Sequence, residues 1–215
     1  MKPTIKINGS ELGLFSSLTY VLERLIDCSK EGTPDPNVGG FKNLVYKVKH
    51  PDILNQYLVF HRNARKEGNY HYLTYTEALK KGDTFAVRGH NTTNVYIYRP
   101  QLLSDANEKA YLKIYNEKGG LFYSSNNLPL KIADVLTGPF PNEGHIDQMA
   151  LVYINTVYQP ANEAVAEIWG HGVSSDGIVA ITKWTCPGYG RKDWGYVNNF
   201  GALLAYAPDA YPRWK

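Results

Sequence analysis

The first half of the chain resembles the second half, and this duplication constrains the fold more than any other feature. When the 215 residues are compared with themselves at an offset of 107, residues 5–27 align without a gap with residues 112–134 and share seven identities. Random pairing would give about one or two. A repeat of this length has the size of a domain, so we expect two copies of one domain. The identical pairs are Lys6/Lys113, Ile7/Ile114, Gly13/Gly120, Leu14/Leu121, Phe15/Phe122, Ser17/Ser124 and Asp27/Asp134.

Two further blocks recur in the same order. Leu44-Val45-Tyr46 returns as Leu151-Val152-Tyr153 at the same offset, and residues 95–100 resemble residues 203–208 with a slip of one position. The polar segment 101–110 lies between the copies and is typical of a short connector. The expected domains are residues 1–105 and 106–215.

Short segments of alternating apolar and polar residues, separated by Gly, Pro and Asn, predict an all-β chain built as two tandem, internally duplicated β-sandwich domains. One short helix is expected at Thr76–Lys81, because a Thr can cap it, two Lys suit its C-terminal end and Gly82 can take a left-handed conformation. The predicted strands are residues 4–7, 21–26, 44–49, 57–61, 69–74, 84–87 and 95–98 in the first copy, and 111–115, 120–124, 130–135, 150–157, 164–169, 178–184 and 202–207 in the second.

Cysteine usage and hydropathy favour a reduced, cytoplasmic site of folding. Cys28 and Cys186 are far apart in sequence and have no Cys or His at metal-ligand spacing beside them, which excludes a disulfide framework and argues against a metal or other cofactor. We find no signal peptide and no apolar run of about 20 residues, so no membrane contact is expected. A net charge of +3 is too small to favour nucleic acid as a partner.

No arrangement of residues points to catalysis. His171 and Ser174 lie close in sequence, but the nucleophile motif G-x-S-x-G is missing, and a turn between two strands explains residues 170–177. His61 and His71 have no neighbouring base or carboxylate cluster and are interpreted as single polar residues of strands. The protein is therefore not expected to be an enzyme. An enzyme acting on nucleic acid or glycan through these histidines is the least favoured hypothesis, after the structural protein and the carbohydrate- or receptor-binding module described below.

Aromatic residues gather near the C-terminus among Gly, Pro and charged residues. Exposed rings beside Arg and Asp are typical of the core of a protein interface, and the same residue types also form sugar-binding faces. With 17 Tyr in the chain, we favour the protein interface. The candidate binding residues are Trp184, Tyr189, Arg191, Trp194, Tyr196 and Trp214.

One segment carries a family resemblance. Residues 111–125 (YLKIYNEKGGLFYSS), followed by the apolar strand 130–135, resemble a strand, turn and strand of small minor tail proteins of long-tailed, siphovirus-type bacteriophages. Tyr123 and Tyr111 depart from the pattern, which usually has Asp and Gly there. The matching residues are Asn116, Gly119, Phe122, Ser124 and Ser125.

The resemblance implies a structural protein of the virion, located at the distal tail and assembled in the host cytoplasm, with other phage tail proteins as partners and no catalytic residues. We expect a tail-tip or fibre-connecting component that acts through protein contacts. The alternative is a carbohydrate-binding or receptor-binding module that uses the aromatic surface of the second copy. Two copies per chain in a homotrimer would present six similar domains, so that a three-fold tip could meet a six-fold tube.

Overall fold

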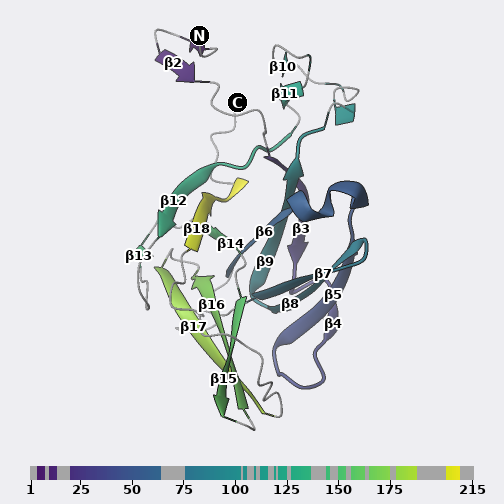
Figure 1. The fold of residues 1–215 in the computed structure, drawn as a ribbon, viewed down its shortest axis with the longest axis vertical. Helices are drawn as coiled ribbons and strands as arrows, with labels where there is room; N and C mark the ends of the chain where they lie inside the picture. The colour runs from purple at the N-terminus through teal and green to yellow at the C-terminus, as the bar shows by residue number, and fades with distance from the viewer. Residues whose placement is uncertain are drawn as a thin grey trace.

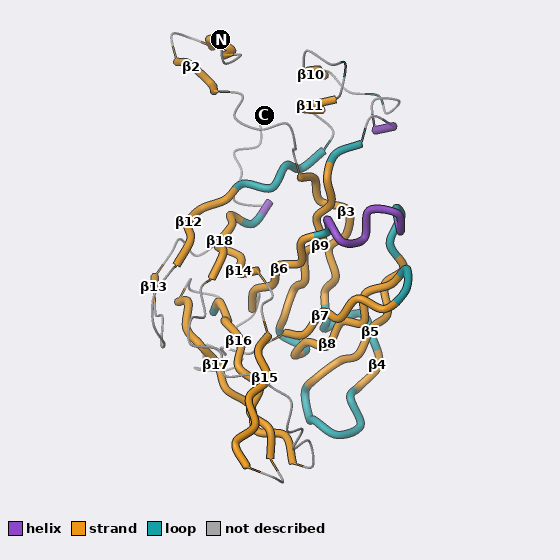
Figure 2. Tube along the Cα trace, viewed as in Figure 1, coloured by secondary structure: helices purple, strands orange, loops and turns teal. Residues whose placement is uncertain are grey.

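The described part of the protein consists mostly of β-strands. In the computed structural model, strands dominate and the main helical element is one short 3-10 helix (Figure 2). All-β architecture is therefore as the alternating sequence pattern predicted. The structure describes residues 4–7, 10–13, 20–63, 76–102, 104–105, 109, 112–115, 119, 121–124, 127–136, 144–145, 150–153, 156–162, 165–174, 178–187 and 202–208.

The elements follow one another along the chain as labelled in Figure 1. Those up to residue 105 are β1 (Thr4–Ile7), β2 (Ser10–Gly13), β3 (Tyr20–Asp27), β4 (Thr33–Pro34), β5 (Phe41–Lys47), the 3-10 helix η1 (Pro51–Gln56), β6 (Leu58–Asn63), β7 (Thr76–Lys81), β8 (Thr84–His90) and β9 (Thr93–Pro100). Those after it are β10 (Lys113–Tyr115), β11 (Leu121–Ser124), β12 (Ile132–Leu136), β13 (Gly144–His145), β14 (Ala150–Tyr153), β15 (Thr156–Asn162), β16 (Val165–Val173), β17 (Ile178–Pro187) and β18 (Ala202–Tyr206).

A six-stranded antiparallel sheet joins the two halves of the chain. Its order is β12-β18-β14-β6-β9-β3, so three strands come from each half. The halves meet where β14 pairs with β6, with Tyr153 opposite Phe60 and Val152 opposite His61. The chain therefore contains one continuous sheet across its middle, a pairing that the repeat did not reveal.

This sheet closes on itself at one end, and the closed part is called the barrel below. The N–H of Leu22 donates to the carbonyl of Leu128 at 2.9 Å, and the N–H of Leu130 donates to the carbonyl of Tyr20 at 2.7 Å. A residue further on, the carbonyl of Lys131 accepts from the N–H of Tyr206 in β18 at 2.9 Å. The segment 128–136 thus pairs first with β3 and then with β18, which joins the two outer edges. Inside lie the buried residues Phe60, Tyr96, Tyr98, Ala205 and Ala207, with Tyr20, Leu22, Leu58, Leu130 and Leu203 packed against them.

Two smaller sheets accompany the shared one. The sheet β4-β5-β8-β7 covers the first half and encloses a second core, which includes Ile26, Val59, Phe85 and Ile97. The sheet β13-β17-β16-β15 belongs to the second half, and its strand β16 lies against β14 and β6 (Figure 1).

The strand order of the two halves corresponds. From the outer edge to the centre, the shared sheet has the order β3-β9-β6 on one side and β12-β18-β14 on the other. Both outer pairs contain one register shift, between Leu22 and Arg24 and between Ile132 and Asp134. The smaller sheets do not correspond in the same way. The strand β8 pairs with β5, which comes early in its half, whereas β16 pairs with β17, which comes late in its half.

This order changes the alignment of the middle repeat block. Leu151-Val152-Tyr153 in β14 stands where Leu58-Val59-Phe60 stands in β6, since each triplet pairs with the last strand of its half. The triplet predicted to match, Leu44-Val45-Tyr46, lies in β5 of a separate sheet. A constant offset of 107 was therefore wrong for this block.

Two local predictions were also wrong, and one helix was missed. Thr76–Lys81 is strand β7 instead of a helix, because Thr76 and Ala78 face the core while β8 supplies backbone partners, and Gly82 (φ +62°) occupies a two-residue hairpin turn. The turn expected over residues 170–177 begins later, since β16 continues to Val173. The helix η1 was not predicted. The strand expected at 69–74 lies outside the described residues.

Candidate functional site

Of the candidate binding residues, the structure describes the backbone of one. Trp184 lies in β17, directly opposite Ile168 of β16, which in turn pairs with Tyr158 of β15. The other five, namely Tyr189, Arg191, Trp194, Tyr196 and Trp214, lie outside the described residues. The aromatic binding surface therefore stays a prediction.

The structure reveals instead a polar junction at His61, where three sheets meet. His61 lies in β6 at the centre of the shared sheet and is 1% exposed. Its Nε2 lies 2.8 Å from the carbonyl oxygen of His171 in β16, and its Nδ1 lies 2.9 Å from the hydroxyl of Thr76 in β7. One imidazole thus connects the central sheet to both smaller sheets and links the two halves.

The partners of His61 fix its protonation state. A carbonyl oxygen can only accept, so Nε2 must carry the hydrogen, and Nδ1 of the neutral ring then accepts from the Thr76 hydroxyl. Burial lowers the pKa of His61 to about 4, and burial likewise lowers the pKa of His171 to about 4. Both rings are therefore neutral at pH 7. With both nitrogens of His61 engaged, this group holds the structure together and is poorly placed to shuttle protons.

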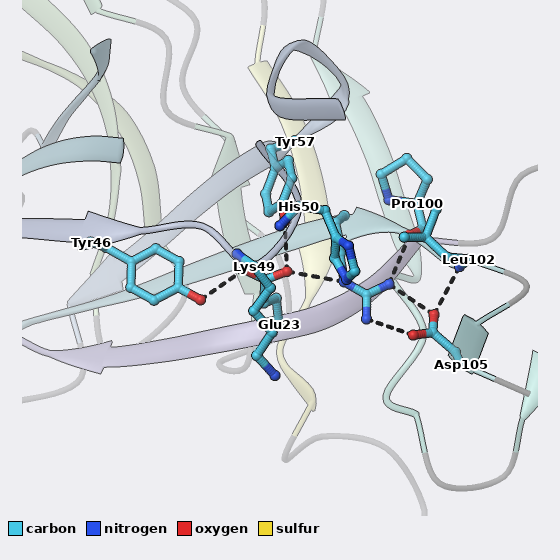
Figure 3. Close-up of polar contacts among 9 residues, drawn as sticks. Glu23, Tyr46, Lys49, His50, Tyr57, Pro100, Leu102 and Asp105 are labelled. Atoms are coloured by element: carbon cyan, nitrogen blue, oxygen red, sulfur yellow. Dashed lines mark hydrogen bonds and ion pairs between the residues drawn. The ribbon is translucent and has the colours of Figure 1, made fainter. Parts of the chain in front are cut away.

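A second polar cluster lies where the barrel closes (Figure 3). Oε1 of Glu23 accepts from the Tyr46 hydroxyl at 2.7 Å and from the N–H of Lys49 at 3.0 Å. Oε2 accepts from the Tyr57 hydroxyl at 2.7 Å and forms an ion pair with Nε of Arg99 at 3.0 Å. The Glu23 side chain is fully buried, so all of its compensation for lost hydration comes from these contacts.

Arg99 extends the cluster to the segment that follows β9. Its guanidinium donates two bonds to the carboxylate of Asp105, at 2.8 and 2.9 Å, in the bidentate geometry that Arg favours. Asp105 also accepts from the N–H of Leu102 at 2.8 Å. Although burial opposes ionisation, the bonds from Arg99 and Leu102 hold the pKa of Asp105 below its usual range. This arrangement fixes the first residues of the connector against the end of the barrel.

The local backbone explains why Glu23 points into this cluster. It is the extra residue of the register shift between Leu22 and Arg24, and a bulge re-aims one side chain of a strand. At the corresponding shift in the second half the extra residue is Ala133, whose side chain has no carboxylate to take the place of Glu23. The cluster thus belongs to the first half alone.

These polar groups are arranged for structure more than for reaction chemistry. Burial raises the pKa of Tyr46 and of Tyr57, and the hydrogen bonds to Glu23 raise it further, so both hydroxyls stay protonated. Burial also raises the pKa of Cys28 to about 12, helped by the charges of Asp27 and Glu31. Among the residues that the structure describes, no group of three His, Cys, Asp or Glu could hold a metal ion.

His61 is a polar residue of a strand, as predicted, but its contact with His171 was not predicted. Glu23, Arg99 and Asp105 were not among the candidate residues. The signal for Glu23 and Arg99 was a charged residue inside an otherwise apolar strand pattern, VLERLI and VYIYRP, whereas Asp105 lies in the polar connector and has no such signal. Such a charge is costly to bury without a partner, which makes each one a candidate for an internal ion pair.

Within the described ranges, no helix combines the length and the apolar character needed to cross a membrane. Comparisons with protein-family models, with curated proteins and with solved structures give no match. Function therefore has to be argued from the residues of this chain.

Proposed function

We propose that the protein is a structural component of a bacteriophage tail, located at the distal tail as a tip or fibre-connecting protein, and that it acts through contacts with other tail proteins. The observation that carries this proposal is the hairpin of β10 and β11. Lys113 pairs with Ser124 and Ile114 with Tyr123, and Gly119 takes a φ of +76° in the connection. This is the strand, turn and strand expected of the segment that resembles minor tail proteins.

The use of buried polar groups also supports an assembly role. His61 joins three sheets, and Glu23, Arg99 and Asp105 fix the closing end of the barrel. The ionisable groups of these two clusters are engaged in holding strands together, as expected for a rigid building block.

Duplication is part of the proposal. The halves 1–105 and 106–215 are taken as two copies of one β-sandwich that have merged through β6 and β14. The matching strand order and the two register shifts support this reading. In a homotrimer the chain would present six related domains to a six-fold tube.

Immunogold labelling of tailed particles, with antibody raised against the purified protein, tests the proposal. We expect gold at the distal end of the tail. Gold on the head, or a complete absence of labelling in particles whose tail tube is labelled as a control, would overturn it. Light scattering on the purified protein tests the trimer separately, with three times the mass of one chain expected.

The carbohydrate-binding alternative makes a different prediction. Binding to a glycan array that disappears in Trp194→Ala, with the unfolding transition unchanged, would favour it over the structural role. Purified protein that associates with tail components and binds no glycan favours the proposal.

A further inference from the structure

The outer face of the sheet β4-β5-β8-β7 carries an apolar groove. It has a volume of about 590 Å³ and is bounded by Gly32 and Thr33 on one side and by Leu79 on the other. Its floor is the strand pair β5 and β8. Val45 is 71% exposed and Leu79 is 55% exposed, although both are large and apolar. Apolar groups left in water inside a groove are typical of a surface that binds another molecule.

The register arranges this face in rows across the strands. Val45 pairs with Ala86, and Leu79 pairs with Ala86 from the other side, so these three form one apolar row. Their neighbours in sequence, Leu44 and Val87, belong to the enclosed core on the opposite face. The apolar row is therefore an addition to the outer face and is not needed to fill the core.

The next row is cationic. Thr84 pairs with Lys47 on one side and with Lys81 on the other, two residues further along β5 and β7 than the apolar row. Both Lys residues are exposed, and the acid beside them is Asp83, which lies 3.0 Å from Lys47. The sheet face next to the lining of the groove thus carries two ammonium groups and one carboxylate.

The opposite end is already neutralised. Arg88, in the row beyond Val45, forms a 2.8 Å ion pair with Asp35 and lies over the ring of Phe41 at 5.7 Å. The free positive charge of the face is therefore at the Thr84 end. A ligand that lies in the groove is best matched by an apolar group over Val45 and a negative group near Lys81.

From this geometry we infer that the groove binds an extended segment of a partner protein, in which an apolar side chain and an Asp or Glu lie two residues apart. Side chains on one face of an extended chain recur every two residues, about 6.5 Å apart, which is the spacing of the two rows. A segment aligned with β5 and β8 would place both groups correctly at once. This inference rests on the proposed function, because it names the chemistry of the tail partner.

The test uses the full-length protein, immobilised and exposed to a displayed library of random ten-residue peptides. Enriched peptides are then synthesised with a fluorescein label, and their dissociation constants are measured by fluorescence anisotropy. We expect the enriched sequences to share an apolar residue and an acidic residue at a spacing of two, with binding that weakens as salt is added.

Variants locate the binding surface. Val45→Asp combined with Leu79→Asp is expected to weaken binding at least tenfold, and Lys81→Ala by about threefold at low salt. Val45→Thr keeps a β-branched side chain, so it tests the apolar contact even where the double variant is poorly folded. Leu25→Asp is the matched control, because Leu25 is also exposed and apolar (42%) but lies in β3 of the shared sheet, and it should leave binding unchanged.

The inference is overturned by a library that yields no enrichment, by enriched peptides without the pattern, or by binding that Val45→Thr and Lys81→Ala leave intact. These results are separate from those that bear on the tail. If the expected peptides bind but immunogold labelling finds this protein absent from the tail, the inference about the groove stands and the proposed function falls. If gold labels the distal tail but no peptide binds, the proposed function stands and the inference about the groove falls.

Discussion

Acid should unfold this protein through its two buried histidines. In the folded protein the pKa of His61 and that of His171 are lowered from 6.5 to about 4, because burial disfavours the charged rings. Between these two pH values the unfolded chain binds two protons that the folded chain does not bind. The free energy of unfolding must therefore fall as the pH falls from about 6.5 to about 4.

The size of the effect follows from the two shifts. Each shift of two to three pKa units corresponds to about 3 kcal/mol, so the pair should remove about 6 kcal/mol by pH 4. A typical domain has only about 5–15 kcal/mol to lose. The histidine window lies mostly above that of the carboxylates, because the pKa values of Asp35, Asp83 and Asp105 are lowered from 3.8 and most of their contribution to stability is lost below that pH.

Urea unfolding followed by tryptophan fluorescence, at half-unit steps between pH 7.5 and 4.5, measures the loss. In His61→Gln the pH-dependent part should fall by about half, because one of the two groups no longer titrates. His50→Gln removes an imidazole from a partly exposed position and is the control. A stability that stays constant across this range, or a slope that His61→Gln leaves unchanged, would refute the reasoning.

Three other predictions concern the core. Arg99→Met should lower the free energy of unfolding by about 3–5 kcal/mol, because it leaves the buried carboxylates of Glu23 and Asp105 without their cationic partner. Arg24→Met removes an exposed ion pair and should lower it by less than about 1 kcal/mol, and urea unfolding compares the two variants. In a Cys186→Ser background, Cys28 should react with a thiol reagent only after urea unfolds the protein, since burial raises its pKa to about 12, and rapid labelling of the native protein would contradict this. Phe60→Ala should cost about 3–5 kcal/mol and destabilise both halves in a single transition, which hydrogen exchange resolved by peptide can check.

The sequence predicted most of the strands because their patterns are local. The runs of β-branched and aromatic residues at Val95–Tyr98 and in Ile178–Trp184 need no partner to be recognised, and both segments form strands. The failure at Thr76–Lys81 has the opposite cause. The segment TEALKK has good helix formers, but their preference amounts to only a few tenths of a kcal/mol per residue. The burial of Thr76 and Ala78 and the pairing of all six residues with β8 outweigh it.

Strand partners were harder to predict than strands. The segment 150–157 was expected to be one strand, but it divides into β14, which joins the shared sheet, and β15, which joins a smaller one. A sequence pattern does not say where a strand changes sheet. For the same reason, the contact between His61 and the carbonyl of His171, which are 110 residues apart, could not be anticipated from either residue.

The barrel needs strands from both halves of the chain. The three strands β3-β9-β6 have two open edges and cover Phe60, Tyr96 and Tyr98 from one side only, so they cannot enclose these side chains by themselves. Pairing β6 with β14 removes one edge from each half, and the segment 128–136 joins the two that remain. Inside the barrel, Ala205 and Ala207 of the second half then pack with these three aromatic residues. Three strands from each half thus provide the six strands that closure needs, and the core inside the barrel is complete only when both halves contribute to it.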